Sequence, residues 1–187
     1  MKKKIILASA SPRRKQLLKT IVNDFLIIPS NINEIYPNNL DPLMVSLYIS
    51  NLKALDIHNK YPSDIVIGCD TTVVINNQVL GKPINEDDAK NMLNSLSNNC
   101  HLVISAVTIY NANTKYEINS INKVYFNKLS EQDISEYLKN DEYKDKAGSY
   151  AIQGLASKFI NKIEGEYESI VGLPIKELKS LLDKINK

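Results

Sequence analysis

The chain has 187 residues, of which 43% are hydrophobic and 24% charged, and its formal net charge is +2. This length fits one domain, or two lobes that share a core, and the balanced charge argues against a nucleic-acid-coating surface. The apolar run that starts at Ile5 is far too short for a signal peptide or a membrane span. We therefore expect a soluble globular protein with neither a membrane nor a nucleic-acid partner.

The cysteines and histidines exclude several kinds of site. Cys69 and Cys100 form neither a CxxC pair nor a metal-ligand spacing, so we expect two reduced, buried thiols in a cytoplasmic protein. His58 and His101 are far apart in the sequence. Neither a histidine metal site nor a Ser-His triad is indicated.

The first predicted strand, over residues 5–8, leads directly into a helix that starts at Ser11. The residues at the start of this helix are typical of a phosphate-binding site. Ser11 suits the N-cap and Pro12 the first helical position. A helix N-terminus offers free backbone N–H groups and the positive end of its dipole to an anion. Ser9, Arg13 and Arg14 lie in the same turn and could hold phosphate oxygens. The alternative is that the two arginines are solvated surface charges.

The next segment is expected to hold a short strand over residues 25–28, a polar loop and a helix that starts at Asp41. Glu34 is the single acid of the loop, and Lys53 lies within the helix. Taken alone, both are typical of solvated surface charges.

The stretch over residues 64–75 organises the chain. Residues 65–67 form a β-branched run without alternation, which predicts a strand buried on both faces. Asp70 follows that run, and its burial would cost free energy unless a cation or several donors compensate. Asn76 and Asn77 predict a hairpin that carries Lys82 back towards Asp70, near one end of a sheet. The alternative is that Asp70 is an ordinary turn or cap carboxylate.

The remaining elements predict a mixed sheet, because the order includes hairpins as well as crossovers. We expect a helix over 85–96, strands over 102–110 and 115–126, a helix over 130–140, a glycine-bounded loop over 145–154, a final hairpin over 159–171 and a C-terminal helix after Pro174.

Three separated parts of the chain carry a resemblance to a known family. They are residues 7–14 (LASASPRR), residues 68–71 with 80–83 (GCDT and LGKP), and residues 145–154 with 163–165 and 171–174. Together they resemble the Maf family of nucleoside triphosphate pyrophosphatases over nearly the whole chain. The resemblance implies an inosine triphosphatase-like α/β fold: a long, twisted, mixed sheet with flanking helices and a deep cleft. It also implies one domain over residues 1–187, with two lobes around that cleft.

The family resemblance further implies hydrolysis of a nucleoside triphosphate to the monophosphate and pyrophosphate by a homodimer that uses Mg²⁺ or Mn²⁺. Thr71 and Gln153 match the residues of the family branch that acts on dTTP and UTP. The resemblance thus implies that the protein removes unwanted nucleotides from the cellular pool. In the branch that prefers 7-methyl-GTP, Gln would replace Thr71 and Glu would replace Gln153. The resemblance assigns base choice to Arg13, Thr71 and Gln153, and proton acceptance to Asp70.

The candidate site residues therefore fall into three groups. They are Asp70, Lys53 and Lys82 for catalysis; Ser9, Ser11, Arg13, Arg14, Thr71, Lys146 and Gln153 for substrate binding; and Asp70 with Glu34 for the metal. Two departures from the family stand out: Asn31 and Asn33 replace the usual aspartates, and Cys69 replaces a small residue such as Ala.

Chemistry read from the residues supports these roles. An ordinary aspartate ionises roughly three units below neutral pH, so Asp70 would act on a metal-bound water or ligate the metal. The planar amide of Gln153 complements the O4/N3–H edge of uracil or thymine. Two alternatives stay open: a non-catalytic nucleotide-binding regulator of cell division, and a pyrophosphatase of the same fold that prefers other or modified nucleotides.

Overall fold

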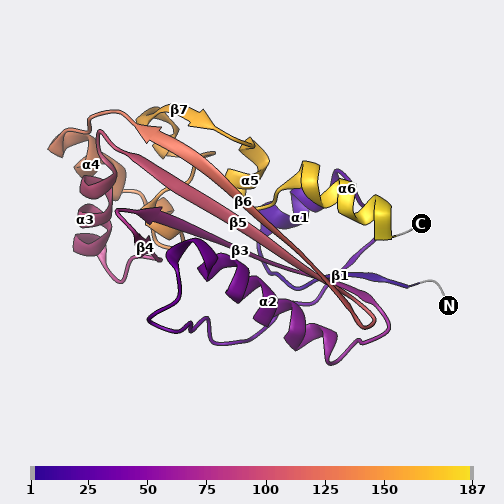
Figure 1. Ribbon diagram of the computed structural model, residues 1–187. Helices are drawn as coiled ribbons and strands as arrows, with labels where there is room; N and C mark the ends of the chain where they lie inside the picture. Colours follow the sequence, from indigo (N-terminus) through magenta and orange to yellow (C-terminus); the bar gives the residue numbers. More distant parts are fainter. Residues whose placement is uncertain (1–2, 186–187) are drawn as a thin grey trace. The chain divides into compact units, whose positions relative to one another are not determined.

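The computed structural model describes residues 3–185 and consists of a sheet with helices on its faces (Figure 1). The strands are β1 (Ile5–Leu7), β2 (Leu26–Ile27), β3 (Ile65–Ile75), β4 (Gln78–Leu80), β5 (Cys100–Asn111), β6 (Thr114–Phe126) and β7 (Ile160–Glu164). The α-helices are α1 (Pro12–Lys19), α2 (Val45–His58), α3 (Glu86–Leu96), α4 (Glu131–Leu138), α5 (Tyr167–Val171) and α6 (Ile175–Ile185). Short 3₁₀ helices are η1 (Pro42–Met44), η2 (Asp141–Tyr143), η3 (Ala147–Ser149) and η4 (Leu155–Phe159).

The sheet is mixed, as the order of elements predicts. Its strand order is β2-β1-β3-β5-β6-β7, and β4 pairs with β3. β1 runs parallel to both β2 and β3, whereas β4 is antiparallel to β3 and β7 is antiparallel to β6. Parallel pairing of β1 with β2 requires a crossover, which α1 provides.

Contacts within the chain define two compact units, and β3, β5 and β6 contribute residues to both. The first unit comprises the chain up to Asp70, Ser105–Ser120 and the segment from Gly172 onward; the second comprises Thr71–Ile104 and Ile121–Val171. The expected arrangement of a single domain with two lobes around a cleft stays a prediction.

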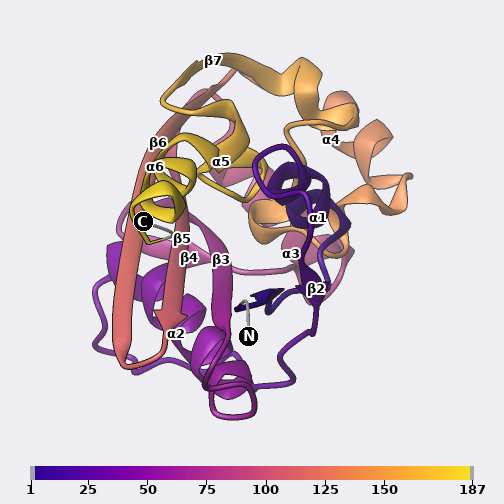
Figure 2. The ribbon, with the colours of Figure 1, turned by 90° about the vertical axis from the view of Figure 1, so that its right-hand side faces the viewer.

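In the first unit, helices cover both faces of β1 and β3. Ile65, Ile67 and Cys69 pack with Leu18 of α1 and Leu178 of α6, whereas Val66 packs with Ala54 and Ile57 of α2. Figure 1 shows α2 below β3 and α1 with α6 above it, and Figure 2 gives the view at right angles. Successive side chains of a strand point to opposite faces, so both faces of β3 are buried. The expectation from the β-branched run is confirmed.

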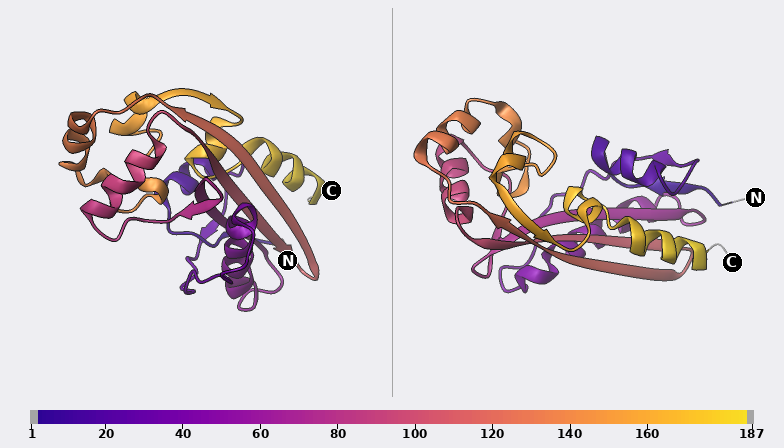
Figure 3. Two further views of the ribbon diagram at one scale, coloured as in Figure 1. Left: turned by 60° about the vertical axis from the view of Figure 1, so that its left-hand side comes forward. Right: turned by 90° about the horizontal axis from the view of Figure 1, so that it is seen from above.

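The second unit has its own apolar core. Leu93 of α3, Tyr137 of α4, Phe126 of β6 and the loop residue Tyr150 are buried in it, together with Phe159 of η4. Helices α3 and α4 lie side by side there (Figure 3). The loop over residues 145–154 is therefore anchored in a core, although it has little regular structure.

Local signals in the sequence are confirmed at several turns. Ser11 accepts a hydrogen bond from the backbone N–H of Arg14 and Pro12 starts α1. Asn76 and Asn77 have φ values of 49° and 59°, which makes the β3–β4 connection the expected hairpin turn. Among residues 3–185, no helix is long and apolar enough to cross a membrane.

Two expectations are wrong. Residues 167–171 form helix α5 and not the second strand of a hairpin: Gly165 turns the chain with φ 122°, and the N–H of Ile170 then bonds to the carbonyl of Glu166. The β-branched pair at 170–171 favours a strand locally, and tertiary contacts override it. Cys100 is exposed at the first position of β5, whereas Cys69 is buried as expected.

Candidate functional site

Gly68 allows α2 to approach β3 closely. A Cβ atom at Gly68 would collide with the backbone carbonyl of Ser50 and would lie 2.6 Å from the backbone N of Ala54. The hydroxyls of Ser50 and Thr108 are hydrogen bonded at 2.9 Å, which ties the same turn of α2 to β5. The residue before Ala54 is Lys53, so this close packing brings the lysine onto β3.

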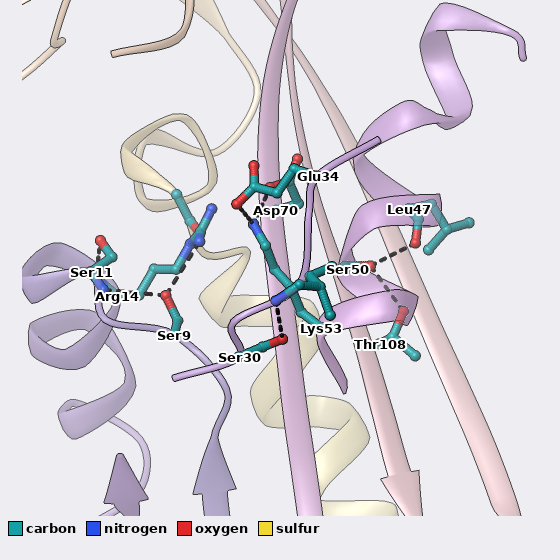
Figure 4. A network of polar contacts seen from close by, with 12 residues as sticks. Ser9, Ser11, Arg14, Ser30, Glu34, Leu47, Ser50, Lys53, Asp70 and Thr108 are labelled. Atoms are coloured by element: carbon teal, nitrogen blue, oxygen red, sulfur yellow. Dashed lines mark hydrogen bonds and ion pairs between the residues drawn. The ribbon is translucent and has the colours of Figure 1, made fainter. Parts of the chain in front are cut away.

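Lys53 bridges two carboxylates. Its Nζ lies 2.7 Å from Oδ1 of Asp70 and 2.8 Å from Oε1 of Glu34 (Figure 4). The side chains of Lys53 and Asp70 are each 10% exposed, whereas that of Glu34 is 51% exposed. The pair is therefore buried with one carboxylate open to solvent beside it, and Lys53 is no solvated helix charge.

Burial raises the pKa of Asp70 above its ordinary value. The positive charges of Lys53 and Arg14 and the hydrogen bond from Lys53 lower this pKa, and the charge of Glu34 raises it. Desolvation is the largest of these influences, so Asp70 holds a proton more readily than an exposed aspartate does. An aspartate in this state is a stronger base than its usual pKa implies.

The start of α1 presents hydroxyl and guanidinium groups together. Ser9 accepts hydrogen bonds from the backbone N–H of Ser11 at 3.3 Å and from Nη1 of Arg14 at 3.4 Å. Nε of Arg14 donates to the carbonyl oxygen of Gly172 at 3.1 Å, a residue from the other end of the chain. Figure 4 shows these three side chains gathered around the first turn of α1. Arg13 is half-buried in the same turn.

One pair of residues in this unit is missed by sequence reasoning. Ser30 donates to Oδ2 of Asp56 at 2.8 Å and accepts from the N–H of Ile32 at 3.4 Å. These bonds fasten the loop that carries Glu34 to the helix that carries Lys53. No local pattern marks the pair, because the two residues lie 26 positions apart in the chain.

The donor set fits a metal that is bound jointly with a substrate. Among residues 3–185, no group of three or more histidine, cysteine, aspartate or glutamate side chains is placed to hold a metal ion. Asp70 and Glu34 nevertheless converge on one ammonium group, so two carboxylates are available within reach of one cation position. Mg²⁺ is commonly held by one or two carboxylates, with substrate phosphates and water supplying the other ligands.

The second unit contains the other four candidate residues. Thr71 is half-buried in β3, directly after Asp70, and Lys82 is exposed two positions beyond β4. The register pairs Val73 with Leu80, so Lys82 follows the strand towards the level of Thr71. The ion-pair partner of Asp70 is Lys53, which corrects the expectation that the hairpin lysine supplies that cation.

Lys146 and Gln153 lie in the anchored loop of the second unit. Lys146 immediately precedes η3, and the N–H of Gly148 bonds to the carbonyl of Gly81, next to Lys82. Gln153 is exposed at a turn. The loop bearing Lys146 is thus joined to the segment that bears Lys82.

Replacing Lys53 with glutamine should raise the pKa of Asp70 further, because an opposite charge in contact with the carboxylate is removed. The measurement is an NMR titration of the Asp70 carboxyl carbon. Lys19→Gln, an exposed lysine of α1, is the matched control and should leave the titration unchanged. An unshifted Asp70 titration in Lys53→Gln would contradict the electrostatic role of this lysine.

Comparison with known proteins gives consistent matches. A family model described as "Maf-like protein" matches residues 4–185. The chain is 40% identical over 181 residues to a protein of Pyrococcus furiosus named "dTTP/UTP pyrophosphatase", covering 97% of this chain and 95% of that one. It is 44% identical over 183 residues to a protein of Alkaliphilus oremlandii with the same name, covering 96% and 95%.

Solved structures match the fold. The chain superposes on a HAM1 protein from Coxiella burnetii with a TM-score of 0.63 and 12% identity, covering 98% of this chain and all of that one. The Ham1 protein of Staphylococcus aureus gives a TM-score of 0.55 and 11% identity, with the same coverage. The expected inosine triphosphatase-like fold is thereby confirmed.

Proposed function

The chain belongs to the Maf family, and we infer from this membership that it is a pyrophosphatase that hydrolyses dTTP and UTP to the monophosphate and pyrophosphate. The relatives that carry this name span nearly the whole chain at about 40% identity. The structural observation that carries the proposal is the buried Asp70–Lys53 pair, whose carboxylate is held beside a second acid. Hydrolysis of a phosphoanhydride needs such a combination of base and cation.

The triphosphate would be held at the start of α1. Ser9, Ser11, Arg13 and Arg14 supply hydroxyl and guanidinium donors there, next to the free N–H groups of the first helical turn. Guanidinium groups bind phosphate oxygens in pairs, so two arginines can fix the orientation of the chain of phosphates. Orientation matters because the attacking water and the leaving oxygen must lie in line.

Asp70 would accept the proton of the attacking water. Its raised pKa supports this role, because a general base works best when its pKa is near the operating pH. Lys53 would keep enough of the carboxylate ionised and would stabilise the negative charge that develops on the phosphates. Burial raises the pKa of Asp70 and the charge of Lys53 lowers it, so the balance of the two sets the pKa of this acid.

A divalent cation would be held by Asp70 and Glu34 together with the phosphates. When bound, Mg²⁺ or Mn²⁺ would neutralise phosphate charge and make the anhydride easier to attack. Asn31 and Asn33 stand where the family commonly has aspartates, so fewer acids are available in this loop. We propose that Glu34 supplies the main carboxylate of the loop.

The roles of the second unit follow from the family resemblance. Thr71 and Gln153 would select the base, with the amide of Gln153 matching O4 and N3–H of a uracil or thymine ring. Lys82 and Lys146 would bind the negatively charged part of the substrate. A homodimer that works in the cytoplasm and clears the nucleotide pool completes the proposal.

The decisive experiment measures pyrophosphate release from UTP, dTTP, CTP, GTP and ATP, each with Mg²⁺ and with Mn²⁺. We expect kcat/KM for UTP and dTTP to exceed that for GTP at least about tenfold, because a site built on hydrogen bonds to one base leaves its polar groups unpaired with another. A wild-type protein that binds these nucleotides but releases no pyrophosphate would favour the non-catalytic regulator instead.

A double substitution serves as the control for base choice. Thr71→Gln combined with Gln153→Glu introduces the two residues of the family branch that prefers 7-methyl-GTP, so the ranking of nucleotides should change. The unfolding temperature of the double variant shows whether it is folded. An unchanged ranking would remove these two residues from base recognition while leaving the hydrolytic activity itself untouched.

A further inference from the structure

We propose that Glu142 is a positioning residue for base selection, acting through the turn that carries Gln153. The inference rests on the proposed function, because it concerns how strongly the enzyme prefers dTTP and UTP. No sequence motif around Glu142 signals this role, because the residue lies in a short 3₁₀ helix eleven positions before Gln153. Contacts on both sides of the turn, all within the second unit, hold it in place.

The carboxylate of Glu142 holds the chain immediately after Gln153. Its Oε2 accepts a hydrogen bond from the backbone N–H of Leu155 at 3.0 Å, and its Oε1 accepts one from the hydroxyl of Tyr137 at 3.2 Å. The N–H of Leu155 belongs to the first residue of η4 and has no partner inside that helix. A charged acceptor at this point fixes where η4 begins, and therefore where the preceding turn ends.

Gly154 lies against the same carboxylate. A Cβ atom at Gly154 would collide with the carboxylate of Glu142, whereas the backbone angle φ of −108° is open to any residue. A larger residue here would therefore displace the carboxylate of Glu142 without straining the backbone. The residue next to Gln153 thus packs directly on the carboxylate, with no side chain between them.

The chain before Gln153 is held equally firmly. The buried hydroxyl of Tyr137 also contacts the carbonyl of Ser149 at 3.2 Å, and Tyr150 forms a 2.6 Å hydrogen bond with Nε2 of His101. Burial raises the pKa of Tyr137, so its hydroxyl keeps the proton that it donates. Burial also lowers the pKa of His101 to about 4, so this imidazole is neutral at physiological pH.

Gln153 itself lies in a tight turn between these two anchors. The N–H of Gly154 bonds to the carbonyl of Ala151 at 3.1 Å, which places Gln153 at the third position of a four-residue turn. Its side chain is exposed, so no packing orients it. The direction in which the amide points is consequently set by the backbone of the turn, and Glu142 is the charged group that fixes that backbone.

Glu142→Gln tests the inference, because it keeps the shape of the side chain and removes the charge and one acceptor oxygen. We expect KM for UTP and dTTP to rise about five- to tenfold with kcat within about twofold, since the lost contact serves binding of the base. Nucleotides that Gln153 does not recognise should keep their KM, so the preference should fall by a similar factor. Amide exchange at Leu155 should become faster.

Two further variants sharpen the test. Glu136→Gln changes an exposed acid of the neighbouring helix α4 whose carboxylate accepts a hydrogen bond from the side chain of Gln132, and it should leave KM and preference unchanged. Gly154→Ala should impair preference in the wild-type background, and this penalty should shrink when Glu142→Ala removes the colliding carboxylate. A smaller penalty in the double variant than in Gly154→Ala alone would be specific to the packing of Gly154 on Glu142.

The outcomes separate this inference from the function on which it rests. A raised KM for UTP and dTTP with kcat close to that of the wild type in Glu142→Gln supports it, and wild-type KM and preference in a folded Glu142→Gln overturn it. Strictly additive effects of Gly154→Ala and Glu142→Ala also overturn it. Absence of pyrophosphate release from wild-type protein overturns the proposed function itself, and the inference falls with it.

Discussion

Asp70→Asn should lose hydrolysis of dTTP and UTP by a factor of about 10² to 10³ or more while the protein stays folded. Asparagine has nearly the same shape but cannot accept the proton of the attacking water, and it is a poorer metal ligand. Lys53 keeps its contact with Glu34 at 2.8 Å, so the substitution does not strand the buried ammonium group. The measurement is the initial rate of pyrophosphate release at saturating nucleotide.

The stability of this variant follows from the sign of the pKa shift. Burial raises the pKa of native Asp70, so the native state binds the proton more tightly than the unfolded chain does. Any stability gained from this group is therefore present at low pH and is lost as pH rises through the native pKa. Ionisation of the buried carboxylate therefore does not favour folding, and the unfolding temperature of Asp70→Asn should stay within about 3 °C of wild type.

Asp24→Asn is the matched control, because Asp24 is an exposed aspartate of the same unit and lies outside the candidate site. Its activity should equal that of the wild type. Asp70→Asn with wild-type activity would show that Asp70 neither accepts the proton nor holds the cation. A large fall in unfolding temperature would instead show that Asp70 is mainly structural.

Gly68→Ala should lower both stability and activity. The added methyl group meets the backbone of α2, which cannot rotate away as a side chain can, so the helix must shift. Overpacking of this kind typically costs about 1–3 kcal/mol. For a chain of this size that corresponds to a fall in the unfolding temperature of roughly 2–12 °C, measured by calorimetry.

The loss of activity in Gly68→Ala should exceed what unfolding explains, because α2 carries Lys53. A displacement of about 1 Å at a catalytic group can reduce the rate about a hundredfold. Gly81→Ala is the control for stability: apart from its sequence neighbours, no atom of the described chain lies within 4 Å of a Cβ there. Gly68→Ala with wild-type stability would mean that α2 is not held by this contact.

The sequence predicts most of the fold because the local signals agree with the tertiary structure. The buried run before Asp70, the Ser11–Pro12 helix start and the asparagine turn after β3 each have a local cause and are all found. Helix α5 is missed because its β-branched residues favour a strand, whereas contacts with the rest of the chain decide its conformation. Local preference and tertiary context conflict there.

The candidate site is predicted less completely, since its ion pairs join distant parts of the chain. Motifs identify Asp70 and Lys53 as candidates, but only the structure shows that Lys53 is the partner of Asp70 and that Gly68 makes the contact possible. The anchoring roles of Asp56 and Glu142 carry no motif at all. Such contacts depend on which helix packs on which strand, and spacing along the sequence does not reveal that.

The bond from Arg14 to the carbonyl of Gly172 spans 158 positions of the chain. A polypeptide still emerging from the ribosome holds the arginine long before it holds the acceptor that orients it. The guanidinium group can therefore take up its final direction only after residue 172 has been added. The proposed triphosphate site at the start of α1 would thus be completed 158 residues after its arginine is made.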